Sequence, residues 1–126
     1  MDIANKVYGY LSTQSSLTAK VSTRIYPNVA TDISNDDDYV VFSIVSDVPE
    51  YTLDGNTQQS EKRLQISVWS KKYLNAHTIK AIIDGLVDNW ATIDKTIVNT
   101  KVINSVDRYE KDTMLHGVIS DYIIFC

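Results

Sequence analysis

The sequence predicts an α+β fold: a single domain over residues 1–126, ordered α-β-β-α-β-β, with helices packed on one face of a mostly antiparallel sheet. Two amphipathic segments with helical spacing alternate with β-branched runs, and no internal repeat interrupts them. Gly and Pro together number only six, so low-complexity linkers are absent. With Cys126 as the only cysteine, no intrachain disulfide can form, and the fold must be held by packing.

The N-terminal third should contain one helix and the start of the sheet. Apolar residues recur at helical spacing over 2–13, which predicts the first helix. A short helical turn around 17–21 and an extended segment at 24–26 follow, since the residue before a proline avoids the helical region. Residues 39–46, YVVFSIVS, are β-branched, aromatic and nearly all apolar, which predicts a central strand covered on both faces.

A second strand pairs with the first in a long hairpin. Residues 62–70 alternate apolar and polar side chains, the period of a strand with one buried face. Between the strands, residues 47–61 are polar and contain Asp54-Gly55, a strong turn signal. We interpret 47–61 as a connection of unusual length, and loops of that length are commonly functional or ordered only on binding.

The second half contains the most regular helix, over 73–90, with apolar residues stepping by three and four. Ser70 or Asn75 could cap it, and the sequence does not separate them. The apolar pattern of 115–125 fits either a central strand or a strand at an interface. The remaining segments are a strand, a charged turn and this final strand: 97–106, 108–112 and 115–125.

Charge is concentrated in one part of the chain. The formal charge is −4, but residues 25–61 carry eight acidic and no basic side chains, and each flank is net positive. Nucleic acid is disfavoured as a direct partner, because basic residues cluster only in the pairs Lys62-Arg63 and Lys71-Lys72. These pairs could instead complement the acidic segment of an identical neighbouring subunit, in a ring-forming contact.

Catalytic and metal chemistry lack their signatures. His77 and His116 stand 39 residues apart without convergent partners, and no phosphate-loop, dinucleotide, hydrolase or zinc-protease motif occurs. The run Asp36–Asp38 fits a solvated acidic loop better than a cation site, because adjacent carboxylates diverge. No membrane span or signal peptide fits. We therefore expect no enzyme, cofactor or metal, and no membrane partner.

Tyrosine is over-used, with eight in 126 residues, and Tyr is favoured where a surface becomes an interface. Tyr26, Tyr39 and Tyr51 flank or lie within the acidic segment, where a core role is least obvious. With the charged residues around them they complete the candidate interface for self-assembly or partner binding: Arg24, Tyr26, Asp36, Asp37, Asp38, Tyr39, Tyr51, Asp54, Lys62, Arg63, Lys71 and Lys72.

The order of these segments resembles a known family. An N-terminal helix, RIYP at 24–27, YVVFSIVSDVP at 39–49, LQISVWS at 64–70 and the helix after it resemble the tail-completion, or tail-terminator, proteins of long non-contractile-tailed bacteriophages. The resemblance implies a non-enzymatic α+β subunit that forms a hexameric ring on the finished tail tube, stops its polymerisation and joins the head.

The resemblance also implies partners and a location. The partners are further copies of the chain, the tail-tube protein and a head-completion or connector protein, and the site is the head–tail interface of a virion assembled in the host cytoplasm. By position, 24–27 and 47–61 would meet neighbouring subunits or the tail tube. Two alternatives stay open: another head–tail joining or neck subunit, and a small ligand- or nucleic-acid-binding module, which the acidic balance disfavours.

Overall fold

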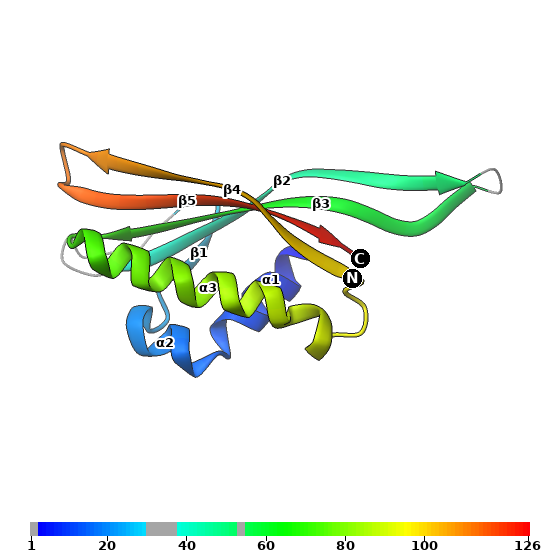
Figure 1. Ribbon diagram of the computed structural model, residues 1–126, viewed down its shortest axis with the longest axis horizontal. Helices are drawn as coiled ribbons and strands as arrows, with labels where there is room; N and C mark the ends of the chain where they lie inside the picture. The colour runs from blue at the N-terminus through cyan, green and yellow to red at the C-terminus, as the bar shows by residue number, and fades with distance from the viewer. Residues whose placement is uncertain (1–2, 30–37, 53–54) are drawn as a thin grey trace.

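The computed structural model describes residues 3–29, 38–52 and 55–126, and for 49–52 and 55–59 the course of the backbone alone (Figure 1). The predicted α+β fold class and element order are confirmed, and the short helical turn and the extended segment before Pro27 become a helix and a strand of their own. The elements are α1 (Ile3–Ser12), α2 (Ser15–Val21), β1 (Ile25–Pro27), β2 (Tyr39–Thr52), β3 (Gly55–Ser70), α3 (Tyr73–Ile93), β4 (Asn99–Glu110) and β5 (Leu115–Phe125).

The strands form one five-stranded sheet in the order β1-β2-β3-β5-β4. Only β1 and β2 pair in parallel, so the predicted mostly antiparallel sheet is confirmed. Because β5 pairs with both β3 and β4, the final strand is a central one. Strand β4 lies at one edge of the sheet, and short β1 lies at the other.

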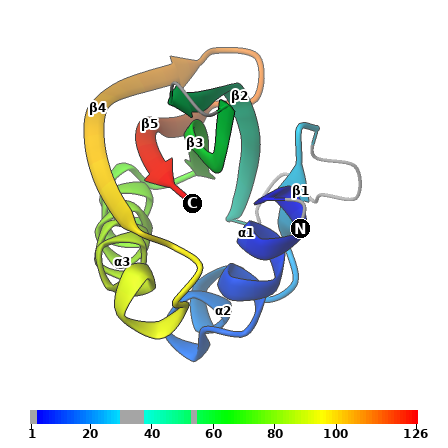
Figure 2. The ribbon, with the colours of Figure 1, turned by 90° about the vertical axis from the view of Figure 1, so that its right-hand side faces the viewer.

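All three helices pack beneath the same face of the sheet, which curves around them in the end view (Figures 1 and 2). Each helix turns its apolar stripe towards the sheet, as its spacing predicted. Full burial of one such side chain contributes about 1.5–3 kcal/mol, so these stripes dominate the stability of the core. The buried helical residues are Ile3, Val7, Leu11, Leu17, Val21, Ala76, Ile79, Ile83, Val87 and Trp90.

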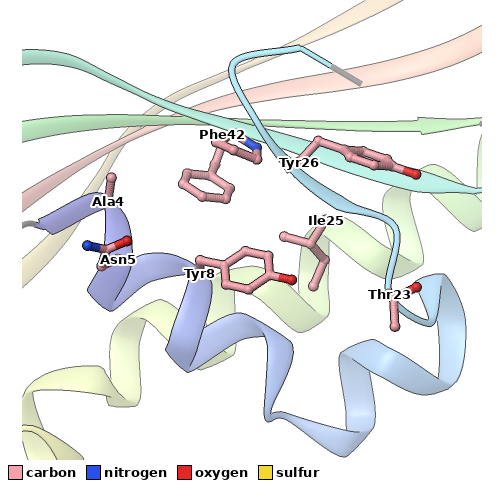
Figure 3. Close-up of a pocket in the computed structure, with 8 residues that line it drawn as sticks. Ala4, Asn5, Tyr8, Thr23, Ile25, Tyr26 and Phe42 are labelled. Atoms are coloured by element: carbon pink, nitrogen blue, oxygen red, sulfur yellow. The ribbon is translucent and has the colours of Figure 1, made fainter. Parts of the chain in front are cut away.

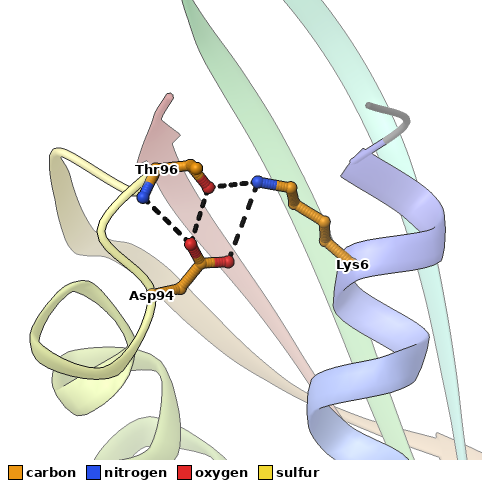
Figure 4. A network of polar contacts seen from close by, with 3 residues as sticks. All are labelled: Lys6, Asp94 and Thr96. Atoms are coloured by element: carbon orange, nitrogen blue, oxygen red, sulfur yellow. Dashed lines mark hydrogen bonds and ion pairs between the residues drawn. The ribbon is translucent and has the colours of Figure 1, made fainter.

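An aromatic stack and several polar contacts join α1 to α3. Tyr10 stacks on Trp90 with ring centroids 5.1 Å apart, and its hydroxyl donates to the Leu86 carbonyl at 2.7 Å. Lys6 of α1 contacts both Asp94 and Thr96, which follow α3 (Figure 4). These contacts hold α1 against the C-terminal end of α3.

The structure shows which residue stands at the N-cap of α3, for which the sequence offered Ser70 or Asn75. The helix starts after Lys72, whose backbone is extended and whose side chain makes no capping bond. The Ser70 hydroxyl accepts the Lys72 backbone N–H at 3.1 Å, while Asn75 lies inside the helix. Ser70 therefore supports the approach to the helix, and neither predicted residue is the N-cap itself.

Two predicted loops are wrong. Residues 47–52 and 55–61 continue β2 and β3 as a paired ribbon up to Thr52 and Gly55, where a connection of fifteen residues was expected. The backbone ladder pairs the N–H and C=O groups of these residues, so the ribbon can form without a regular apolar alternation in its sequence. The turn predicted at 108–112 is likewise displaced, because β4 runs to Glu110 and the turn occupies 111–114.

The prediction that 39–46 is covered on both faces is also wrong. Val40 and Phe42 are buried beneath the helices, but Val41 and Ser43 are only half-buried and Val45 is exposed. The helices cover one side of this strand, and no other part of the described chain covers the second side. The apolar residues that suggested double coverage therefore lie on an open surface.

Candidate functional site

The sheet has an open face, defined here as the face turned away from the helices. Tyr122 marks the helix side, because its hydroxyl donates to Asp84 of α3 at 2.5 Å. Successive strand residues point to opposite faces, and paired residues share one, so the register assigns the others. The open face carries Tyr26, Tyr39, Val41, Trp69, Val106, Ile119 and Ile123, together with Arg63, Gln65 and Asp121.

Aromatic side chains occupy one end of this face. The rings of Tyr26 and Tyr39 meet edge to face with centroids 6.4 Å apart, and Trp69 is the cross-strand partner of Tyr39. The Trp69 ring lies over Gly117, where an added Cβ would stand 2.6 Å from ring carbon Cζ3. Burial, followed by the charge of Glu110, raises the pKa of Tyr39. The aromatic side chains thus pack against one another and against the sheet, although no helix covers them.

A polar cluster lies at the centre of the open face. Arg63 pairs with Asp121 at 2.9 Å, and the Gln65 amide donates to the second carboxylate oxygen at 3.2 Å. Because Arg63 is partly exposed, the pair adds little to the free energy of folding. The planar guanidinium of Arg63 and the apolar residues beside it give the open face both polar and apolar groups. Such a combination suits a protein contact that forms after folding.

Strand β4 presents an unpaired edge. Ten consecutive residues, 101–110, are exposed, and Val102, Val106 and Tyr109 are each more than one third accessible. An exposed edge strand is a template for pairing with another chain, although the bulge between Val102 and Asn104 and the four charged residues of β4 limit unspecific pairing. The open face and this edge together form a continuous candidate contact surface.

The predicted interface residues fall into separate groups. Tyr26, Tyr39 and Arg63 lie on the open face. Lys62 points to the other side, 3.8 Å from the Asp47 carboxylate. A polar pocket beside the start of α3 gathers a third group, and other predicted residues lie outside what the structure describes. The pocket group is Arg24, Asp38, Lys71 and Lys72; the undescribed group is Asp36, Asp37, Asp54 and the side chain of Tyr51.

Sequence reasoning missed a cluster that joins α3 to β4. His77 Nε2 lies 2.9 Å from Asp107 Oδ1 without forming a hydrogen bond, and the Tyr73 hydroxyl donates to Asp107 Oδ2 at 3.0 Å. His116 packs edge to face against Tyr73, with centroids 5.7 Å apart. Its members are 30 or more residues apart between elements, so no local pattern shows the cluster. The residues with described positions contain no group of three or more ligands able to hold a metal ion.

An open groove of about 460 Å³ runs between α1 and β1 (Figure 3). The rings of Tyr8 and Phe42 lie along it, with Ala4, Asn5 and Ile25 around them. Its lining offers no carboxylate, imidazole, thiol or ammonium group. The groove is therefore lined mainly by apolar and aromatic side chains.

No helix in the described ranges 3–29, 38–52 and 55–126 is long and apolar enough to cross a membrane. A helix-backed sheet with an open face of apolar and polar side chains and an exposed edge strand is the architecture of a subunit that packs against other protein chains. The sequence identifies which subunit. It matches the family Tail completion protein gp17 over residues 5–126, so the chain belongs to that family and is a structural component of the phage virion.

A solved structure supports the same fold. The chain superposes with a TM-score of 0.76 on a chain from the "Virion of native gene transfer agent (GTA) particle", covering 94% of this chain and 90% of the other. The sequences are 15% identical, so the likeness concerns the fold. No curated protein sequence matches the chain.

Proposed function

We propose that the chain forms a ring on the end of the tail tube, terminates its polymerisation and joins the tail to the head connector. The family supplies the tail-completion role. The observation that carries the ring is the one-sided coverage of the sheet: its strands bear apolar side chains on both faces, while the helices cover one. Apolar surface of this kind is stabilised by burial against other chains.

The two edges of the sheet differ, which suits a closed ring. One edge is the long exposed strand β4, and the other is formed by short β1 and the uncovered part of β2. A contact between unlike surfaces is heterologous, and it closes into a ring when the rotation between neighbours permits. Six copies, as in the resembled family, would place the open face and the edges in contact with neighbours, tail tube or head connector.

Tails assembled without the protein test this function. We expect tubes of variable length that fail to join heads, and addition of the purified protein should stop further elongation and allow joining, both read by negative-stain electron microscopy. A neck subunit that acts only in joining would instead leave tail length uniform in its absence. Uniform tails that also join heads without the protein would contradict both roles.

A further inference from the structure

A pocket of about 280 Å³ lies where the end of α2, the segment before β2 and the start of α3 meet, at the left end of Figure 1. We call it the basic pocket. Four of its lining residues are cationic and one is acidic, giving a formal charge of +3. It is lined by Lys20, Arg24, Lys71, Lys72, Asp38, Ser70 and Asn75.

The cations of the basic pocket are not neutralised within the described chain. Arg24 donates to the Asp38 backbone carbonyl at 2.8 Å and Lys71 to the Thr113 carbonyl at 2.6 Å, contacts that bring no opposite charge. The ammonium groups of Lys20 and Lys72 make no hydrogen bond or ion pair with any residue that the structure describes. The first turn of α3 holds no acidic residue, so its partial positive charge adds to theirs.

A complementary surface lies at the other end of the molecule. The part of the β2–β3 ribbon formed by residues 45–52 and 55–61, called the arm, extends beyond the sheet at the right of Figure 1. Its residues include the acidic Asp47, Glu50 and Glu61 and no basic one. Strand β5 ends at Phe125 opposite Glu61, and the next residue, Cys126, exchanges backbone hydrogen bonds with Ser60, so beyond Ser60 the arm consists of two strands only. The arm and the basic pocket face opposite ends of the long axis, and the arm cannot reach the pocket of its own chain.

We infer that the basic pocket binds carboxylates of the arm of a second copy, in a head-to-tail contact. This inference rests on the proposed ring, because a contact between unlike ends is the kind that closes one. The charges set the register of the two copies and speed their encounter. The open face takes no part in this contact and stays available to the tail tube or the head. The competing occupant is the chain's own acidic run next to Asp38, with Asp36 and Asp37.

Single charge reversals in the full chain test the contact, with self-association measured by sedimentation velocity at 50 and 500 mM NaCl. Lys72→Glu should weaken association about tenfold at low salt, and the difference should largely vanish at high salt. Lys95→Glu, an exposed reversal after α3, is the matched control and should leave association unchanged. Glu61→Lys should weaken association as Lys72→Glu does, and the two changes in one chain should restore it.

Three outcomes overturn the inference. One is equal association of the Lys72→Glu and Lys95→Glu variants. Another is restoration of the Lys72→Glu variant by Asp36→Lys with Asp37→Lys, and not by Glu61→Lys, which assigns the pocket to the chain's own acidic run. The third is a wild-type protein that stays monomeric at both salt concentrations. Tail length and head joining are measured separately, so the proposed function can stand or fall without this contact.

Discussion

Replacing Tyr122 with Phe tests how the sheet is joined to α3. The Tyr122 side chain is fully buried, and its hydroxyl donates to Asp84 Oδ1 at 2.5 Å. Phe retains the ring, so only the hydrogen bond to a charged group is lost, a contribution of about 1.5–3 kcal/mol. Because Asp84 keeps its ion pair with Lys80 and is partly exposed, we expect a loss of about 2 kcal/mol in the free energy of unfolding.

Urea unfolding followed by circular dichroism and tryptophan fluorescence measures this loss. Tyr8→Phe is the matched control, because that ring is exposed and its hydroxyl has no hydrogen-bond partner in the described part of the chain; its effect should stay within about 0.5 kcal/mol. A double-mutant cycle with Asp84→Asn isolates the pair. A Tyr122→Phe variant as stable as the control, or a cycle without coupling, would refute the reasoning.

The same substitution has an alkaline signature. Burial, then the hydrogen bond to Asp84 and its charge, raise the pKa of Tyr122 above its ordinary value of 10.0. The unfolded chain therefore releases this proton first, and the stabilisation is complete below pH 10 and declines above it. By pH 11 the wild type should lose about 1.4 kcal/mol through this group, and Tyr122→Phe should lose none of it. A stability difference that stays constant from pH 9 to 11 would contradict the shift.

Three further predictions concern two substitutions and the amide exchange of the arm. Gly117→Ala should displace the Trp69 ring and cost about 1–3 kcal/mol, seen as a fluorescence shift together with a lower urea midpoint. Asp94→Ala removes the hydrogen bonds from Thr96 and should cost about 1 kcal/mol at pH 7. These bonds, with Lys6, lower the pKa of Asp94 below 3.8, so the loss relative to wild type should disappear only as the pH falls below that value. Amides of the arm should exchange faster than those of central β3 in the free protein and become protected on assembly, because a two-stranded ribbon alone is marginally stable.

The sequence was sufficient to predict helices and strands where burial makes apolar residues recur at a regular spacing. Apolar residues at every third or fourth position predicted α3, and an apolar run predicted β5 with the same bounds that the structure shows. The arm escaped prediction because its strands extend beyond the rest of the sheet and are held by a hydrogen-bonded backbone ladder, while their polar sequence lacks the apolar alternation that identifies a strand. Apolar residues at 39–46 were correctly assigned to a strand, but composition could not show that only one face would be covered.

The candidate surfaces were predictable in part. Over-used tyrosine led to Tyr26 and Tyr39, which share the open face, although Tyr39 is itself almost covered by its neighbours. Adjacent basic pairs suggested one complementary surface, but alternation along β3 turns Lys62 and Arg63 to opposite faces. The contacts of Asp107 with Tyr73 and His77 depend on how β4 lies against α3, which no local pattern encodes.

Cryo-electron microscopy of the head–tail junction tests the central claim most directly. The proposed function predicts a closed ring of copies of this chain at the end of the tail tube, with β4 and the open face of the sheet buried against neighbouring chains. A single copy, an unclosed arrangement, or copies placed along the tube and absent from its end would contradict it.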